Sequence, residues 1–236
     1  MIEEYRDYCV LKAFNLSAKQ IDEINALSTK GVFIQVSQEY FDDTIIVINK
    51  SESEVIFQDS LNKINEIAND KIYADYDTTL EECVIKMATE KNLKIAAAES
   101  LTGGMLCSRL VNVSGASAVL YEGFVTYSSS SKVRRLHVKS TTIDSYGAIS
   151  KETCKEMVQG LLANKEIQIA VATTGCAGPN SDESGVEVGT VFVGVGCHKG
   201  DKEEGFHLEG NRETIRKTTT NIALYMLLNV VKNACK

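Results

Sequence analysis

The sequence predicts a layered α/β fold, with a larger α/β/α domain preceded by a smaller N-terminal α+β domain. Segments with helical spacing of apolar residues alternate with short strand-like runs along the chain, which is typical of sheets covered by helices. Residues 167–173 form an apolar run of the kind found in strands buried on both faces. The 236 residues, of which 44% are hydrophobic, are enough to bury a sizeable core.

Residues 1–77 are predicted to form the small accessory domain. Ser17 and Gln20 resemble a capping box, and Ile21, Ile24 and Leu27 follow it at helical spacing. The elements expected here are a helix opened by Ser17, strands over 32–36 and 44–48, and a helix over 59–69.

Residues 78–236 are predicted to form the larger domain, with the boundary near 76–79. Thr79 and Glu82 form a second capping-box pattern there, and Ser150 and Asn211 are typical helix N-caps. The elements expected, in order, are a helix after Thr79, a strand over 95–98, a helix over 105–111, a strand over 121–127, a helix over 150–164, strands over 167–173 and 190–197, a last strand through 206–208, and a helix after Asn211.

The charge distribution argues against a nucleic-acid partner. The net charge is −7 at pH 7, and residues 1–77 hold 15 acidic and 7 basic side chains, a charge of −8. Such a segment repels phosphates, whereas the nearly neutral remainder suits a small-molecule site. No apolar run is long enough to cross a membrane, and the start MIEEYRDYCVLKAF does not look like an export signal, so we expect a cytoplasmic protein.

The cysteines and histidines suggest neither disulfides nor a metal site. Seven cysteines are scattered along the chain, and an odd number without an export signal favours reduced thiols. The three histidines are dispersed as well, so no metal ligand set is visible.

The first candidate site is Ser100, which follows an expected strand and precedes Thr102, Gly103 and Gly104 at the start of an expected helix. Backbone N–H groups at such a position can hold an oxyanion or a phosphate, and the helix dipole favours negative charge. The alternative is an ordinary turn and helix cap, for which Ser, Thr and Gly are common residues.

The second candidate is the pair Tyr127 and Lys132 after the next strand. A desolvated lysine can act as general base for a serine, and a tyrosine hydroxyl can relay a proton. The alternative is that Lys132 opens a solvated basic helix together with Arg134 and Arg135.

Two further stretches carry candidate binding residues. Thr174 and Gly175 end the most hydrophobic strand, where glycine allows close approach of a ligand, although a plain turn fits equally well. Cys176 lies in the same loop without an identifiable base, so it is a poor nucleophile candidate. Arg212 opens the last helix and could bind a phosphate or a tetrahedral intermediate, or lie on the surface.

Together these stretches resemble the C-terminal domain of the CinA family, the competence/damage-inducible or nicotinamide-mononucleotide deamidase proteins. The runs AESLTGG, EGFVTYSSSSK, GAIS, TGCAGP, VGTV and GNR occur in the family's order. The resemblance implies a catalytic set of Ser100, Tyr127 and Lys132, with Thr174 and Arg212 as further active-site positions. It also implies that residues 1–77 correspond to the family's middle domain, and that the N-terminal domain of full-length members is missing.

The reaction implied is hydrolysis of nicotinamide mononucleotide to nicotinic acid mononucleotide and ammonia, with no metal or organic cofactor. Backbone N–H groups around Thr102–Gly104 or Thr174–Gly175 would hold the oxyanion, and Arg212 or the glycine turn the phosphate. We expect a homodimer whose partner is a small pyridine nucleotide. The alternatives are a non-catalytic nucleotide-binding or regulatory protein and a KH-like nucleic-acid module, although Gly31 is the only glycine of residues 1–77, so the GxxG clamp is absent.

Two departures from the family pattern concern the pocket. Leu101 stands where the family usually has cysteine, and Glu187 where it often has proline. The loop over 180–187 also lacks the glycine-rich and acidic sequence that is usual in the family. We expect this difference to bear on the choice of substrate more than on the chemistry.

Overall fold

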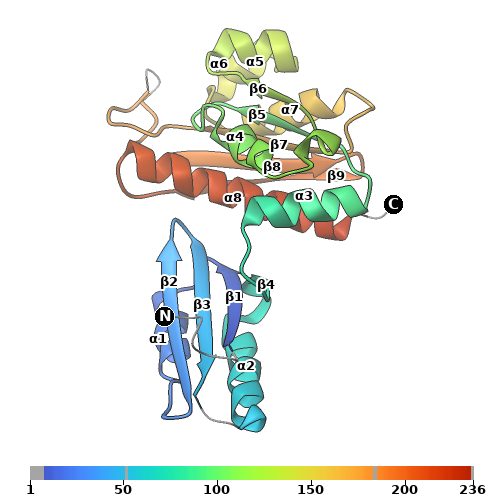
Figure 1. Cartoon of the computed structure of the whole chain (residues 1–236). Coiled ribbons are helices and arrows are strands. Elements are labelled where there is room, and N and C mark those ends of the chain that lie inside the picture. The colour runs from blue at the N-terminus through green and yellow to red at the C-terminus, as the bar shows by residue number, and fades with distance from the viewer. Residues whose placement is uncertain (1–7, 51–52, 183–184, 235–236) are drawn as a thin grey trace. The chain divides into compact units, whose positions relative to one another are not determined.

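The computed structural model describes residues 8–50, 53–182 and 185–234, and the chain divides into two compact units, 1–79 and 80–236 (Figure 1). The first seven residues, Cys235, and two residues of the loop over 180–187 lie outside the described part. The six described cysteines are all free thiols.

The first unit is a four-stranded antiparallel sheet with two helices. Its strand order is β2-β3-β1-β4, and the helices α1 and α2 pack with the strands around one apolar core that includes Ile24, Ile45 and Ile64. The elements are β1 (Tyr8–Phe14), α1 (Ala18–Asn25), β2 (Val32–Glu39), β3 (Asp42–Asn49), α2 (Glu54–Ala68), a 3-10 turn (Asn69–Lys71) and β4 (Ile72–Ala74).

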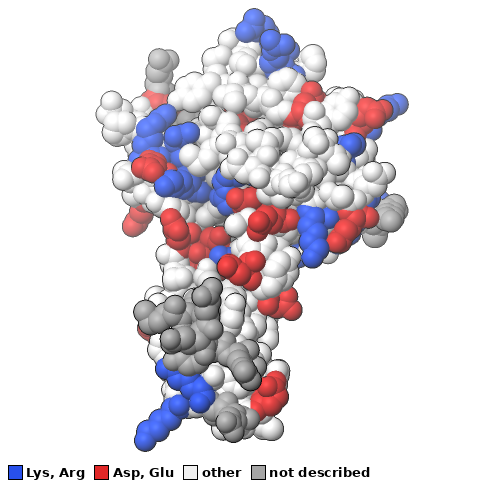
Figure 2. Space-filling model, in the orientation of Figure 1, with Lys and Arg blue, Asp and Glu red and all other residues white. Residues whose placement is uncertain are grey.

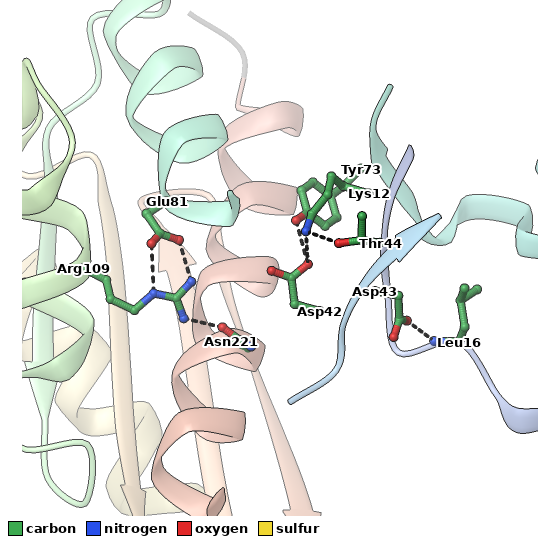
Figure 3. Close-up of polar contacts among 9 residues, drawn as sticks. All are labelled: Lys12, Leu16, Asp42, Asp43, Thr44, Tyr73, Glu81, Arg109 and Asn221. Carbon is green, nitrogen blue, oxygen red and sulfur yellow. Dashed lines mark hydrogen bonds and ion pairs between the residues drawn. The ribbon is translucent and has the colours of Figure 1, made fainter. Parts of the chain in front are cut away.

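The predicted capping box of this unit is confirmed, but the strands β1 and β4 were missed. Ser17 accepts from the N–H of Gln20, and the Gln20 side chain accepts from the N–H of Ser17. Strand β1, which pairs with both β3 and β4, carries Lys12 in the middle of its apolar run. The structure holds this ammonium against Thr44 (2.7 Å) and Asp42 (3.4 Å), so a charged residue interrupts the pattern without interrupting the strand (Figure 3).

A buried carboxylate also shapes the first unit. Asp43 is fully buried, and its Oδ2 accepts from the backbone N–H of Leu16 at 2.6 Å (Figure 3). Burial raises the pKa of Asp43 to about 6. Helix α2 begins five residues before the predicted helix, at Glu54.

The second unit is an α/β/α sandwich, as the sequence predicts. Its five-stranded sheet has the order β6-β5-β7-β8-β9, in which β6, β5 and β7 are parallel and β8 and β9 antiparallel. The elements are α3 (Leu80–Glu90), β5 (Ile95–Glu99), α4 (Met105–Asn112), a 3-10 turn (Ala116–Ala118), β6 (Leu120–Val125), α5 (Ser129–Leu136), α6 (Ser140–Tyr146), α7 (Lys151–Leu162), β7 (Ile169–Gly175), β8 (Thr190–Cys197), β9 (Gly200–His207) and α8 (Arg212–Asn233).

The helices cover the two faces of this sheet. Helix α7 packs on one face, with α5 and α6 against it, and α8 packs on the other face together with α3 and α4 (Figure 1). The predicted N-caps Ser150 and Asn211 accept from backbone N–H groups three residues on. None of the helices in the described part of the chain is both long and apolar enough to cross a membrane.

A charged network joins the three helices of the α8 face. The Arg109 guanidinium donates from Nε (3.1 Å) and Nη2 to the two carboxylate oxygens of Glu81, and from Nη1 to Asn221 (Figure 3). These residues lie on α4, α3 and α8. The network fixes α8 against α4, the helix that follows the Ser100 turn.

The parallel strands bring the candidate residues to one edge of the sheet. Glu99, the last residue of β5, is in register with Val125 on β6 and Thr173 on β7. Ser100, Tyr127 and Thr174 follow these positions directly or within two residues. The carboxyl ends of parallel strands form the usual binding crevice of such sheets.

Candidate active site

Ser100 lies in the turn between β5 and α4. Its backbone N–H donates to Thr173 O at 3.0 Å, which extends the pairing of β5 with β7 by one residue. The residue is buried, with 8% of its surface exposed, yet it lines a cavity. Its Oγ accepts a hydrogen bond from Lys132 Nζ at 2.9 Å. The serine is therefore in direct contact with a nitrogen base.

Lys132 reaches Ser100 from helix α5. Its side chain is almost completely buried, with 1% exposed, and its ammonium also donates to Thr126 O at 2.8 Å. The interpretation of this residue as part of a solvated basic helix is wrong. Burial lowers the pKa of Lys132 to about 8, because the apolar surroundings disfavour the charged form. About a tenth of the amine is thus neutral at pH 7, far more than for an ordinary lysine.

The two residues open onto a cavity of about 590 Å³ at the carboxyl ends of β5 and β7. Its lining includes most of the predicted site, but not Thr102, Gly103 or Gly104. The lining residues are Ser100, Leu101, Tyr127, Ser128, Ser129, Lys132, Ala148, Ile149, Thr174, Gly175, Cys176, Ala177, Gly178, Asn180, Ser181, Asp182 and Arg212.

The N–H groups of the glycine turn have acceptors inside the protein. Gly103 N–H donates to Ser100 O at 3.1 Å, and Gly104 N–H donates to the carboxylate of Glu99 at 2.9 Å. The fully buried Glu99 also accepts from Leu106 and Cys107 at 3.1 and 2.8 Å. The negative charge that the α4 N-terminus attracts is thus Glu99 itself, and the N–H groups of Gly103 and Gly104 are not available to hold the expected oxyanion or phosphate.

Thr102 likewise faces the interior. Its hydroxyl is 2.8 Å from that of Thr173, and both side chains are fully buried. Thr102 therefore ties the turn to β7.

Thr174 and Gly175 also line the cavity. Thr174 Oγ1 donates to Ala148 O at 2.8 Å. At Gly175 a Cβ atom would lie 2.7–2.9 Å from Val191 and Thr190, so the close approach of β8 requires glycine there. Cys176 is buried, and its Sγ lies 3.4 Å from Asn180 O.

Arg212 and Tyr127 meet at the mouth of the cavity. Arg212 Nη1 donates to Gly178 O at 2.7 Å, and Nη2 donates to the Tyr127 hydroxyl at 3.1 Å. Tyr127 is 62% exposed, and its hydroxyl accepts a hydrogen bond from Arg212 rather than contacting Ser100 or Lys132. The structure therefore brings Tyr127 to the same cavity but next to the arginine.

Sequence reasoning missed two charged residues at the base of the turn. Glu99 caps α4, and Arg216 on α8 donates to the carbonyls of Leu101 and Thr102. An acidic residue at the end of an otherwise apolar strand, directly before a helix, was the available signal for Glu99. Arg216 had no local signal, because it lies more than a hundred positions from the turn that it contacts.

Most of the chain matches a known protein family. The sequence profile of the CinA C-terminal domain matches residues 77–231. The chain belongs to the CinA family.

Curated relatives of this CinA-family chain carry the name competence-damage inducible protein. That of Clostridium novyi (strain NT) is 41% identical over 177 residues, 75% of this chain and 42% of the relative. That of Caldicellulosiruptor saccharolyticus is 36% identical over 197 residues, 82% and 48% of the two chains. The chain thus spans less than half the length of the curated relatives it matches.

Solved structures of the family share the fold. The competence damage-inducible protein A of Klebsiella pneumoniae superposes with a TM-score of 0.63 at 28% identity, covering 66% of this chain and 97% of the other. The competence/damage inducible protein of Agrobacterium tumefaciens gives 0.60 at 34% identity, covering 65% and 97%.

Proposed function

We propose that this CinA-family protein is an amidohydrolase that converts nicotinamide mononucleotide to nicotinic acid mononucleotide and ammonia. The observation that carries the proposal is the 2.9 Å contact between Lys132 Nζ and Ser100 Oγ in a buried site. A serine paired with a lysine of lowered pKa is an activated nucleophile suited to acyl transfer.

The reaction proceeds in two halves through an acyl-enzyme. Neutral Lys132 takes the Ser100 proton while Oγ attacks the carboxamide carbon. The tetrahedral intermediate collapses as Lys132 returns that proton to the leaving nitrogen, and ammonia departs. Water then attacks the ester, Lys132 accepts its proton, and the carboxylic acid leaves as the proton returns to Ser100. The bond from Lys132 to Thr126 O aims the amine at Ser100 throughout.

We assign the oxyanion to the N–H groups of Leu101 and Thr102. The N–H groups of Gly103 and Gly104 have acceptors already, whereas among the described residues no acceptor contacts the other two. The N–H of the residue after a nucleophile is a common oxyanion donor, and Leu101 lines the cavity.

The substrate phosphate is assigned to Arg212 at the mouth of the cavity. Figure 2 shows basic side chains gathered near the start of α8, the helix that begins at Arg212. The cavity-lining Ser128 and Ser129 open helix α5, and N–H groups at a helix start also attract anions. A guanidinium can bind phosphate through two parallel hydrogen bonds. Tyr127 positions this guanidinium through its hydroxyl.

Ammonia release from nicotinamide mononucleotide and from nicotinamide riboside tests the proposal. We expect turnover of the nucleotide and much weaker turnover of the riboside, which lacks the phosphate. Ser100→Ala should abolish release, while Ser108→Ala, an exposed serine on α4, should leave it unchanged. A folded wild-type protein that binds the nucleotide but releases no ammonia would favour the non-catalytic regulatory alternative. The cytoplasmic location and the homodimer stay predictions.

A further inference from the structure

The turn that carries Ser100 is hydrogen-bonded to an arginine that lies outside the cavity. Arg216 Nε donates to Leu101 O at 2.9 Å, and Arg216 Nη2 donates to Thr102 O at 2.9 Å. Arg216 lies on α8 one helical turn after Arg212 and is partly buried. It does not line the catalytic cavity, so any effect on the reaction must pass through the turn.

The two bonds determine which way the central peptide of the turn faces. Gly103 N–H donates to Ser100 O at 3.1 Å, which makes residues 100–103 a β-turn with Leu101 and Thr102 at its centre. Types I and II of such turns differ mainly in the direction of that central peptide. In a trans peptide the C=O and N–H groups point in opposite directions. With its carbonyl drawn to Arg216, the Leu101–Thr102 peptide turns the Thr102 N–H away from α8.

Glu99 binds the backbone N–H groups that follow this turn. Its buried carboxylate accepts from the N–H groups of Gly104, Leu106 and Cys107. The Arg216 cation thus donates to two carbonyls of the turn, and the Glu99 anion accepts from the N–H groups that follow the turn. Both contacts are charge-assisted and therefore stronger than neutral hydrogen bonds.

Gly103 makes room for the arginine. Its φ is +61°, and a Cβ atom there would lie 3.3 Å from Arg216 Nη2. A side chain at this position would strain the backbone and press on the guanidinium. Glycine at this position thus suits both the backbone conformation and the approach of Arg216 to the turn.

We propose that Arg216 is a positioning residue for the turn of residues 100–103, the nucleophile turn. It keeps the Leu101 carbonyl away from the developing oxyanion, and it fixes the N–H groups of Leu101 and Thr102 that bind this oxyanion. A carbonyl dipole facing the cavity would repel the negative charge of the tetrahedral intermediate, whereas a preorganised N–H stabilises it. The guanidinium also polarises the peptide whose N–H belongs to Thr102, making that N–H a better donor. The inference rests on the proposed acyl transfer at Ser100 and adds a residue to it.

The test compares Arg216→Met and Arg216→Lys with Lys217→Met, a matched loss of charge at the next position of the helix. Two readouts are used: ammonia release from nicotinamide mononucleotide, and the rate at which a fluorophosphonate labels Ser100. In labelling, Oγ bonds to phosphorus, fluoride leaves and Lys132 takes the proton, so this readout needs the nucleophile turn but not the natural substrate.

We expect Arg216→Met to lower kcat and the labelling rate by about 10- to 100-fold, with KM within about threefold of wild type. The pH midpoint set by Lys132 should not move, because the base itself is untouched. Added guanidinium ion should restore part of the labelling rate, and Lys217→Met should match wild type. Arg216→Lys should fall between, because one ammonium cannot serve both carbonyls in the fork geometry.

A folded Arg216→Met protein that labels and turns over at the wild-type rate would overturn the inference. Should that variant fail to fold, Arg216→Lys decides, since a wild-type labelling rate in it has the same meaning. If wild type releases no ammonia but Ser100 is labelled, the proposed substrate is wrong. The labelling rates of the variants still test the role of Arg216 in that case.

Discussion

Replacing Lys132 with methionine should change how the stability of the protein depends on pH. The folded-state pKa of Lys132 is about 8, against 10.5 for the free side chain. Between these values the unfolded chain binds the proton more tightly, so stability rises with pH, and below pH 8 the full penalty of the buried ammonium applies. A shift of this size corresponds to about 3 kcal/mol of destabilisation at pH 7.

The pH dependence of the difference in unfolding free energy between wild type and Lys132→Met separates the effect of the charge from that of packing. Methionine also removes the hydrogen bonds of Lys132 to Ser100 and Thr126, which costs about 1 kcal/mol each at any pH. From the two pKa values, the lysine penalty falls by about 2 kcal/mol between pH 7 and pH 9.5. The wild type should therefore gain about 2 kcal/mol relative to Lys132→Met over this interval.

Urea unfolding of both proteins at pH 7 and pH 9.5 measures this difference. Other titrating groups are common to the two proteins and cancel in the comparison. The control Lys165→Met removes an exposed lysine of the same unit and should show no such pH-dependent gap. A gap for Lys132→Met that stays constant within about 0.5 kcal/mol would refute the lowered pKa and, with it, the supply of neutral amine at pH 7.

Three further predictions follow from the same geometry. Lys132→Arg should fold yet show less than about 1% of wild-type ammonia release, because guanidinium does not give up its proton; near-normal release would show that only positive charge is needed. Glu99→Gln should lower the free energy of unfolding by about 3 kcal/mol in urea titrations, because an amide cannot accept from three N–H groups, while exposed Glu90→Gln should be neutral. Residues 78–236 expressed alone should release ammonia, since every cavity residue lies in them; a folded but inactive fragment would assign residues 1–77 a part in the site.

Local patterns predicted much of the fold because they are set by neighbouring residues. The capping residues Ser17, Ser150 and Asn211 bond N–H groups three positions on, and strand β8 was predicted with its observed bounds. Strand β1 was missed because Lys12, in its middle, is neutralised by residues of another strand.

The site was less accessible to local reasoning. The motif order indicated that Ser100 and Lys132 act together, but the burial of Lys132 depends on how α5 packs against the sheet. Base rates for lysine favoured a solvated side chain, and only tertiary packing reverses that. The roles of Glu99 and Arg216 depend on backbone groups of the turn, and side-chain patterns do not report which backbone groups are already bonded.

The proposed reaction is hydrolysis of the carboxamide of nicotinamide mononucleotide by Ser100 and neutral Lys132. The most direct measurement is the initial rate of ammonia release from this nucleotide between pH 6 and pH 10, for wild type and Ser100→Ala. We expect a wild-type rate that rises with pH to a plateau with a midpoint near the Lys132 pKa of about 8, and no release by the variant. Release by Ser100→Ala, or a wild-type rate that is zero at every pH, would contradict it.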